Sequence, residues 1–298
     1  MRKLFIVTVI LAVASIALAG TMYIHLDDGT TEEIEIGSIE SITFAGDEDF
    51  EWCDIPAGDY TYGPGDTIKT IDYDYQIMKY EVTNQQYVDF LEEAYSLGDV
   101  WIDSGDVVGY YEGDDNYSAG TYEFLNLDDN DCRIDWDGSN FSIIFSYEDH
   151  PVVEVSWFGA WAFAEHYGMR LPTEQEWEKA ARSITGYEYP WGNSIDYSRA
   201  NYSDSGDPWD NGTTPVGMYN GQTIQGFSTT DSPSPFGVYD MAGNVWEWTD
   251  SWWNNTYFYR VVRGGSWYDI TQRLRSWDLD YFRPTVSGLV YGFRCVVL

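Results

Sequence analysis

Basic residues are scarce in this chain of 298 residues, in which 15 Lys and Arg oppose 50 Asp and Glu and give a formal net charge of −35. So acidic a surface repels phosphate backbones and anionic lipid headgroups at ordinary ionic strength. The sequence therefore argues against nucleic acid and membrane surfaces as partners. The acidity is more typical of a soluble or salt-adapted surface than of specific cation binding.

Cysteine and histidine are also rare. The chain contains Cys53, Cys132, Cys295, His25, His150 and His166. No two cysteines have CxxC spacing, and thiols and imidazoles so scattered argue against a zinc site. Three cysteines allow at most one intramolecular disulfide, so at least one thiol is left over and the pairing is open.

Long apolar runs are absent after the first twenty residues. Arg2 and Lys3 precede an apolar stretch at residues 4–16, and the small-residue run Ala-Leu-Ala follows it. The stretch is shorter than the roughly 20 apolar residues that cross a bilayer, and the pattern predicts a cleaved signal peptide over residues 1–19. We therefore expect a mature protein without a membrane span that is secreted, periplasmic or extracellular. No cysteine follows the cleavage site to carry a lipid anchor.

The composition nevertheless indicates a folded core, since aromatic residues make up 18% of the chain and charged residues 22%. After the signal segment, apolar and polar residues alternate on both sides of the turn signal Asp28 and Gly29, which predicts a small β-hairpin unit over residues 20–46. Two strands are too few to be stable alone. Residues 45–49 are the expected boundary before the main domain, residues 50–298.

Capping residues place the first two of three predicted helices. Thr83 and Gln86 form a capping-box pattern at the start of the first helix. Ser156 can cap the second helix, and Gly168 is expected to end it. Apolar residues recur at helical spacing after both caps, so each helix is expected to bury one face.

The third predicted helix begins at Thr173, where Glu176 completes a second capping box. Trp177 and Ile184 are among the apolar residues that recur at helical spacing, and we expect both to face the core. The rest of the main domain is predicted to consist of short strands and turns.

An acidic, aromatic insertion separates the first two helices, over residues 98–149. Its densest part, LDDNDCRIDWDG, offers the carboxylate oxygens that calcium prefers. The EF-hand spacing is not met, since Arg133 stands in the third ligand place counted from Asp129 and Gly138 comes too late. This spacing favours a solvated loop over a metal site.

Eight motifs follow one another through the main domain. They are MKYEVTNQQYVDFL (78–91), HPVVEVSW (150–157), MRLPTEQEWEKAAR (169–182), YPWGN (189–193), TTPVG (213–217), PFGVYDMAGNVWEWTDSWW (235–253), RGGSW (263–267) and GFRC (292–295). In order and spacing they resemble the sulfatase-modifying factor family, whose founding activity is that of formylglycine-generating enzyme. The resemblance implies an α+β variant of the C-type lectin fold that is rich in loops, with few helices and small antiparallel sheets.

The resemblance also implies a first structural calcium site. It would use the side chains of Asn201 and Asp207 and the backbone oxygens of Tyr202 and Trp209, with one extra residue before the TTPVG motif. Oxygen ligands at turns are what calcium requires, and an ion that binds only the native state stabilises a loop-rich domain.

A second calcium site is implied with its spacing intact. Its ligands would be the side chains of Asp240 and Glu247 and the backbone oxygens of Gly243 and Val245. The alternative is that Asp240 and Glu247 only cap or solvate a turn. We expect both ions, where bound, to be structural rather than catalytic.

The enzymatic step is where this chain departs from the family. Members that generate formylglycine hold one copper ion with two cysteine thiolates, at positions that correspond to Asp269 and Leu274 here. Carboxylate and alkyl groups cannot replace thiolates as ligands of soft copper(I). The resemblance therefore implies neither copper nor a catalytic residue in this chain.

Two further family features are missing. In the family, the cysteine of GFRC forms a disulfide with a cysteine whose position corresponds to Ala164 in this chain. That partner is missing here, so Cys295 is either free or paired with Cys53 or Cys132. A second enzyme branch uses non-haem iron with histidine ligands, and no HxxxHxE-like constellation occurs in this chain.

The region between RGGSW and GFRC is rich in Tyr, Trp and Asp. Aromatic rings give a large contact area at low entropy cost, so we expect a ligand-binding surface here. Its candidate residues are Trp267, Tyr268, Asp269, Trp277 and Tyr281. The region also resembles the variable proteins of diversity-generating retroelements, which share this fold. The hypothesis that this region is diversified in the same way requires a near-identical template copy beside the gene, and the copy should differ mainly at adenines.

Together, the residues and the resemblance predict an exported, calcium-stabilised family member without formylglycine-generating activity that acts in ligand or protein recognition. The competing class is an oxidoreductase that acts on protein sulfur through the same cleft. A third possibility is a structural envelope protein that the hairpin unit docks to a partner. Whether the ligand is a protein or a small molecule is open.

Overall fold

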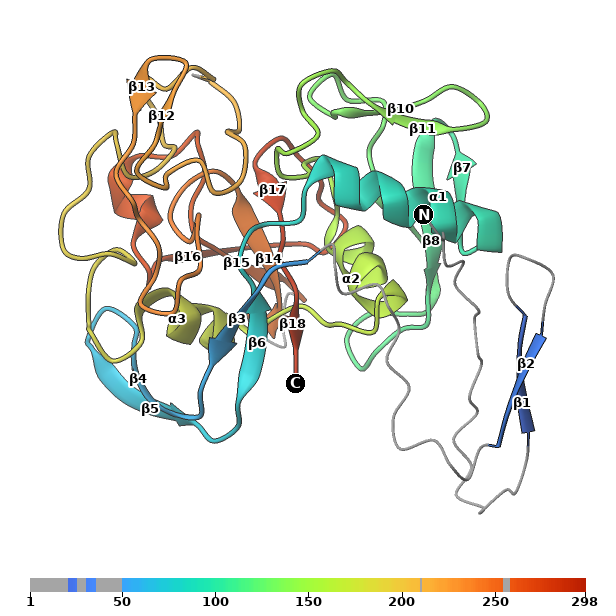
Figure 1. Cartoon of the computed structure of the whole chain (residues 1–298), viewed down its shortest axis with the longest axis horizontal. Helices are drawn as coiled ribbons and strands as arrows, with labels where there is room; N and C mark the ends of the chain where they lie inside the picture. The colour runs from blue at the N-terminus through green and yellow to red at the C-terminus, as the bar shows by residue number, and fades with distance from the viewer. Residues whose placement is uncertain (1–20, 26–30, 36–49, 210, 254–257) are drawn as a thin grey trace. The chain divides into compact units, whose positions relative to one another are not determined.

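The computed structural model divides the chain into a small unit, Met1–Phe50, and a large unit, Glu51–Leu298 (Figure 1). The residues that the structure describes are 21–25, 31–35, 50–209, 211–253 and 258–298. The expected signal peptide lies outside the described residues. Of the helices within them, none is both long and apolar enough to cross a membrane.

The small unit contains two described strands. β1 (Thr21–His25) and β2 (Thr31–Glu35) pair antiparallel, with Thr21 opposite Glu35 and His25 opposite Thr31. The alternation of apolar and polar residues predicts this pairing, because side chains of one strand point to opposite faces in turn. The residues of the predicted turn lie outside the described residues.

Helix α1 (Asn84–Leu97) begins where the capping box predicts. The backbone N–H of Gln86 donates to Thr83 Oγ1 at 3.2 Å, and the backbone N–H of Thr83 donates to Gln86 Oε1 at 3.0 Å. Gly98 ends the helix with φ at 81°, a left-handed conformation that glycine adopts without strain. The capping prediction is confirmed at both residues.

Helix α2 (Trp157–His166) is capped by Ser156, whose Oγ accepts the backbone N–H of Gly159 at 3.2 Å. Gly159 lies so close to the carbonyl oxygen of Phe124 that a Cβ there would overlap it. The missing side chain lets α2 pack directly on the strand that contains Phe124. Gly168 follows the helix end with φ at 68°.

Helix α3 (Glu174–Arg182) has the second capping box. The N–H of Glu176 donates to Thr173 Oγ1 at 3.1 Å, and the N–H of Thr173 donates to Glu176 Oε2 at 2.8 Å. The expectation that Ile184 faces the core is wrong, since its side chain is 54% exposed. The helix ends at Arg182 because Ser183 turns to φ 51°, and this change of direction carries Ile184 outward.

The C-terminal motifs share one sheet with the strand order β16-β15-β14-β17 (Figure 1). Its strands are β14 (Trp246–Trp252), β15 (Arg260–Arg263), β16 (Leu279–Phe282) and β17 (Tyr291–Gly292). β14 pairs antiparallel with β15 and parallel with β17, so this one pair departs from the expected antiparallel arrangement. The sheet therefore brings the GNVWEW, RGGSW and GFRC motifs side by side.

The two ends of the large unit meet in a second sheet, ordered β18-β6-β3. Its strands are β3 (Trp52–Ile55), β6 (Tyr75–Met78) and β18 (Val296–Val297). The hairpin β4 (Gly58–Tyr62) and β5 (Thr67–Ile71) packs against α3. Trp177 of α3 lies in the core cluster between these elements, together with Ile77 and Val296. A smaller hairpin joins β12 (Thr223–Ile224) and β13 (Phe227–Ser228).

The acidic insertion is folded into short strands, and the first part of its densest acidic run, residues 126–133, is a loop between two of them in which Asp128 and Asp129 are exposed. Its strands are β7 (Val100–Asp103), β8 (Asp106–Tyr111), β9 (Gly120–Leu125), β10 (Ile134–Trp136) and β11 (Phe141–Ile143). Cys132 and Ile134, inside the densest acidic part, are buried. Strand β9 contacts α2 and β11 contacts α1, so scattered apolar residues attach the insertion to both helices.

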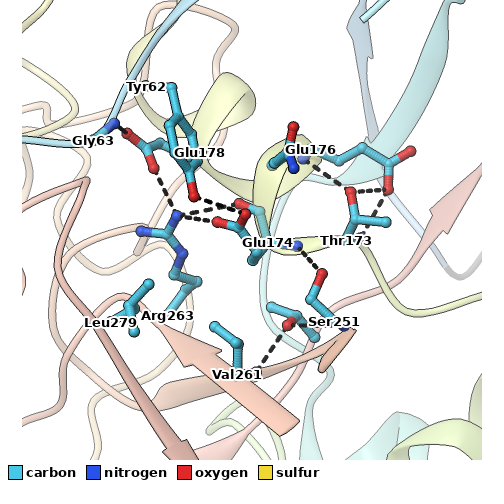
Figure 2. A network of polar contacts seen from close by, with 12 residues as sticks. Tyr62, Gly63, Thr173, Glu174, Glu176, Glu178, Ser251, Val261, Arg263 and Leu279 are labelled. Carbon is cyan, nitrogen blue, oxygen red and sulfur yellow. Dashed lines mark hydrogen bonds and ion pairs between the residues drawn. The ribbon is translucent and has the colours of Figure 1, made fainter. Parts of the chain in front are cut away.

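A buried ionic network attaches α3 to the C-terminal sheet (Figure 2). Arg263 Nη2 of β15 donates to Glu174 Oε2 at 2.5 Å and to Glu178 Oε2 at 2.6 Å. Tyr62 of β4 donates its hydroxyl to Glu174 Oε1 at 2.9 Å. Because the side chains of Arg263 and Glu178 are fully buried, each is held by the charge of the other. The network fixes the position of α3, and with it Trp177.

Candidate functional site

The C-terminal motifs converge on a buried ion pair between Glu247 of β14 and Arg294. Arg294 Nε donates to Glu247 Oε2 at 2.7 Å and Arg294 Nη2 donates to Oε1 at 2.8 Å. Trp177 Nε1 donates to the same Oε2 at 2.7 Å. Arg294 also donates to the carbonyl oxygens of Met78 at 3.1 Å and Tyr239 at 2.9 Å. The pair therefore ties GNVWEW, GFRC and α3 together.

The second predicted calcium set lies around this pair. Asp240 is buried, and its Oδ2 accepts the backbone N–H of Gly217 at 2.5 Å. No hydrogen bond between described residues uses the carbonyl oxygen of Gly243 or Val245. Both carbonyls thus keep their lone pairs for another ligand, as the predicted donor set requires.

Glu81 adds a third buried carboxylate beside Asp240 and Glu247, and the sequence did not point to it. Its Oε2 accepts from Asn244 Nδ2 at 2.7 Å, whereas its Oε1 has no hydrogen-bond partner among the described residues. Burial, and then the charges of Asp240 and Glu247, raise the pKa of Glu81 well above its usual value. Burial raises the pKa of Asp240 to about 6. Arg294 neutralises only one of the three charges, so these residues fit a bound cation.

The first predicted set is more self-contained. Asp207 Oδ1 accepts the backbone N–H of Trp209 at 2.8 Å and its Oδ2 accepts the Ser205 hydroxyl at 2.7 Å. The Tyr202 carbonyl oxygen accepts the N–H of Ser205 at 2.9 Å. The carboxylate thus braces its own turn, as aspartate does in many loops. Asn201 is buried and donates from Nδ2 to the Gly212 carbonyl oxygen at 2.9 Å.

The two predicted sets meet at Asn201. Its carbonyl oxygen accepts the N–H of Asn244 at 3.0 Å, and its Nδ2 lies 3.3 Å from Asn244 Oδ1. Gly243 has φ at 89°, and a Cβ there would overlap the Asn201 carbonyl oxygen. Across the described part of the chain, no group of three His, Cys, Asp or Glu side chains could hold a metal by itself. Backbone oxygens would have to complete either set.

The two positions of the family copper ligands hold other structural roles here. Asp269 Oδ2 accepts from Trp246 Nε1 at 2.9 Å, from the Ser266 hydroxyl at 2.5 Å and from the Ser266 N–H at 3.1 Å. Leu274 is fully buried, and its methyl groups lie where a Cβ on Gly265 would be. One position therefore braces a turn and the other fills the core, and neither presents a soft metal ligand.

All three cysteines are free and buried. Cys53 pairs with Ile77 in the sheet, and Cys295 immediately precedes Val296, which pairs with Ile77 from the other side. Two strand spacings of about 4.8 Å separate Cys53 from Cys295, which is beyond the Cα distance that a disulfide spans. Burial raises the pKa of the Cys132 thiol to about 12, so this thiol is unreactive.

The predicted ligand-binding residues do not form one surface. Tyr268 is 72% exposed at the turn after β15, where the N–H of Trp267 donates to the Asn244 carbonyl oxygen at 2.9 Å. Tyr281 is 37% exposed and stacks on Trp253, beyond the far end of β14, with the ring centroids 4.5 Å apart. The seven residues of β14 span about 20 Å between the two places and separate them.

The remaining two candidates also face different neighbours. Trp277 lies against α3, with its ring 4.9 Å from the guanidinium of Arg182. Asp269 points back to Ser266 and Trp246 rather than outward. Only Trp267 and Tyr268 are adjacent, and their rings make an edge contact with centroids 5.5 Å apart.

A cavity of ≈ 230 Å³ lies beside Trp267 and was not predicted. It is lined by Asp131, Arg133, Val153, Asn211, Gly212, Thr213, Trp267 and Leu289. These residues come from five stretches of the chain, the insertion among them, so no local pattern could have indicated the cavity. A larger hollow of ≈ 640 Å³ contains none of the predicted site residues. It is lined by Tyr73, Asp74, Arg170, Thr173, Asp250 and Leu298.

Glu154, next to the cavity-lining Val153, is an unusual residue that the sequence did not single out. It has φ at 60°, in the left-handed region that a side chain other than glycine seldom adopts, and its side chain is 2% exposed. Burial, and then the charges of Asp129, Asp131 and Glu123, raise the pKa of Glu154 to about 7. Strained and buried ionisable residues occur often at functional sites.

The family model described as "Sulfatase-modifying factor enzyme 1-like domain" matches residues 47–298. That span contains all eight motifs and the whole of the large unit. It also includes the folded insertion, so the cavity lies inside the matched region.

Several relatives are similar to parts of the chain. "Serine/threonine-protein kinase pkn1" of Chlamydia caviae is 34% identical over 232 residues, which are 72% of this chain and 31% of the relative. "Inactive C-alpha-formylglycine-generating enzyme 2" of Bos taurus is 39% identical over 157 residues, 49% of this chain and 50% of the relative. "Formylglycine-generating enzyme" of Thermomonospora curvata is 34% identical over 186 residues, which are 52% of this chain and 57% of the relative. The chain thus spans about a third to somewhat over half of these relatives.

Two solved structures show the same fold. The structure of PvdO from Pseudomonas aeruginosa has a TM-score of 0.55 and 20% identity, and the match covers 82% of this chain and 93% of that one. Treponema denticola variable protein 1 has a TM-score of 0.55 and 19% identity, and the match covers 83% of this chain and 94% of that one. These likenesses bear out the loop-rich α+β architecture and speak only to the fold.

Proposed function

Because the chain belongs to the sulfatase-modifying factor family, we propose that it is an exported recognition domain of that family, which binds a ligand or a protein on a calcium-stabilised scaffold. It does not generate formylglycine. The observation that carries this proposal is the pair of positions at which family enzymes hold copper: Asp269 braces a turn and Leu274 is buried in the core.

Without the two thiolates the chain lacks the copper ligands that formylglycine generation needs, whereas the fold of the family is kept. Copper(I) needs soft ligands, and the three thiols of this chain are buried elsewhere in the fold. A relative named "Inactive C-alpha-formylglycine-generating enzyme 2" supports the idea that family members persist without that activity. The alternative, an oxidoreductase on protein sulfur, would need a redox centre for which neither position provides a ligand.

Two features support recognition as the remaining role. Tyr268 and Ile270 are 72% and 63% exposed on a turn that the Asp269 carboxylate braces, so a rigid backbone presents large apolar groups to solvent. A solved structure of this fold is named Treponema denticola variable protein 1, and diversification of this region of our chain stays a hypothesis. A search beside the gene for a near-identical template copy tests it, and the hypothesis is lost if no copy is found.

Export and calcium complete the proposal. Export is supported by the basic start, apolar stretch and small-residue site of residues 1–19. Calcium is supported by the excess of buried carboxylates around Arg294 and by the unpartnered Glu81 Oε1. Addition of calcium to chelator-treated protein should raise the Tm, and an unchanged Tm would remove calcium from the proposal.

Copper(I) titration and a peptide oxidation assay test the loss of activity. The protein is mixed with a cysteine peptide of the kind that formylglycine generators oxidise, with the Thermomonospora curvata relative as the active control. We expect no stoichiometric copper(I) binding and no oxidised peptide. The Asp269→Cys/Leu274→Cys variant restores both thiolates and serves as the matched control for copper(I) binding. Turnover by the unaltered chain would refute the proposal.

A further inference from the structure

The cavity beside Trp267 has a strongly acidic setting. Asp131 lines it, and Asp129, Asp131 and Glu123 all act on the buried Glu154 next to it. Carboxylates thus gather on this side of the cavity, where Arg133 is the basic residue of the lining.

Arg133 is the cation in the lining, and its interactions are already taken up. Its Nη1 donates to the Asn130 carbonyl oxygen at 3.1 Å, and its guanidinium lies 4.6 Å from the ring centroid of Tyr147. Its Nη2 forms an ion pair with Asp131 Oδ1 at 3.7 Å, which is too long for a hydrogen bond. The other carboxylate oxygen of Asp131, Oδ2, has no hydrogen bond with a described residue and can accept one from a second cation.

The apolar residues of the lining suit the alkyl part of a cation. Trp267 is held in place by its Nε1, which donates to the Leu289 carbonyl oxygen at 3.3 Å. An indole attracts a cation to its face, and Val153 and Leu289 add aliphatic surface for methylene groups. A volume of ≈ 230 Å³ equals the share of about seven waters, which matches an amine with a short alkyl chain.

We propose that this cavity binds a compact organic cation, with an ammonium or guanidinium group at Asp131 and its alkyl part against Trp267. An inorganic ion fits less well, because the carboxylates are not arranged to coordinate one metal. The cation proposal rests on the proposed recognition function only in that both assign Trp267 to a ligand-binding site. If the cation proposal fails, the copper-binding and peptide-oxidation results are unaffected, so failure of one proposal can be distinguished from failure of the other.

Binding of n-pentylammonium to the full chain, measured by calorimetry, tests the proposal. We expect saturable binding, and Asp131→Asn should weaken it about tenfold, as expected for the loss of a hydrogen bond to a charged group. Asp131 is 46% exposed, so this variant should fold. Asp135→Asn is the matched control, because it removes the same charge from an exposed residue of the same insertion outside the cavity.

Three results would overturn the proposal. One is equal weakening by Asp131→Asn and Asp135→Asn, which would mean only diffuse attraction to an acidic protein. Another is equally tight binding of neutral 1-pentanol, which would mean an apolar cavity without charge selection. The last is the lack of saturable binding up to concentrations well above about 1 mM, since weaker association is hardly specific.

A second arm identifies the source of the cation. An acetylated and amidated lysine tripeptide is compared with free n-pentylammonium on the unaltered protein and on Asp131→Asn. Tighter binding of the peptide supports a lysine side chain of a protein partner, and tighter binding of the free amine supports a small molecule. If neither binds more tightly to the unaltered chain than to Asp131→Asn, the proposed site is wrong.

Discussion

Replacement of Glu154 by Gln should stabilise the protein at neutral and alkaline pH. The native state raises the pKa of Glu154 from 4.5 to about 7, so it holds the proton more tightly than the unfolded chain does. A folded-state pKa above the unfolded one means that stability falls as pH rises from about 4.5 to about 7. At 1.36 kcal/mol per pKa unit, the shift amounts to about 3 kcal/mol above pH 7. Gln does not ionise, so the variant does not lose this stability as the pH rises.

The substitution isolates charge from other effects. Gln has nearly the volume of Glu and the same difficulty at a φ of 60°, so packing and backbone strain stay constant. Urea unfolding at pH 5 and pH 8 should show the advantage of Glu154→Gln growing by about 2 kcal/mol between the two. Glu112→Gln, at an exposed position of the insertion, is the control and should show little change. An equal advantage at both pH values, or a loss of stability at pH 8, would refute the reasoning.

Four further predictions concern the scaffold. Arg263→Met leaves the buried Glu174 without its cation and Glu178 with Arg182 alone, and should cost about 3–5 kcal/mol in denaturant unfolding; a loss below 1 kcal/mol would contradict the charged network of Figure 2. Thr173→Ala removes a helix cap and should cost about 1 kcal/mol, whereas Thr173→Ser should restore most of it. Gly243→Ala puts a Cβ at a φ of 89° against a carbonyl oxygen and should destabilise by more than about 1 kcal/mol; a stable variant would show that this loop relaxes. Asp240→Asn should abolish the calcium-dependent part of the Tm, and a retained calcium response would place the ion elsewhere.

Local features of the fold could be predicted because they depend on residues within one turn. The capping boxes at Thr83 and Thr173 identified two helix starts, and Ser156 a third, since a cap needs only a side-chain oxygen and the N–H groups that follow it. The prediction that Ile184 faces the core was wrong because Ser183 changes the chain direction, which the apolar spacing does not reveal. The packing of the insertion was not predicted, because its few apolar residues are buried against α1 and α2, which are distant in sequence.

The candidate site divides in the same way. Asp240 and Glu247 could be proposed from one continuous motif, but the motif does not reveal that Arg294, 47 residues away, already binds Glu247, or that Glu81 joins them. The aromatic candidates come from one stretch of sequence, and the sheet separates Trp267 from Tyr281. The cavity was beyond prediction because five distant stretches line it.

By itself the sequence determined the identity of the side chains at positions 269 and 274, and so the lack of a thiolate pair there, because ligand softness is a property of the residue and needs no fold. It also determined the starts of the helices, through contacts a few residues long. Only the tertiary structure decided that three carboxylates share one arginine, that Glu154 is buried at a strained φ, and that a cavity adjoins Trp267. Burial and electrostatic coupling depend on which distant segments pack together, and no local pattern in the chain specifies that.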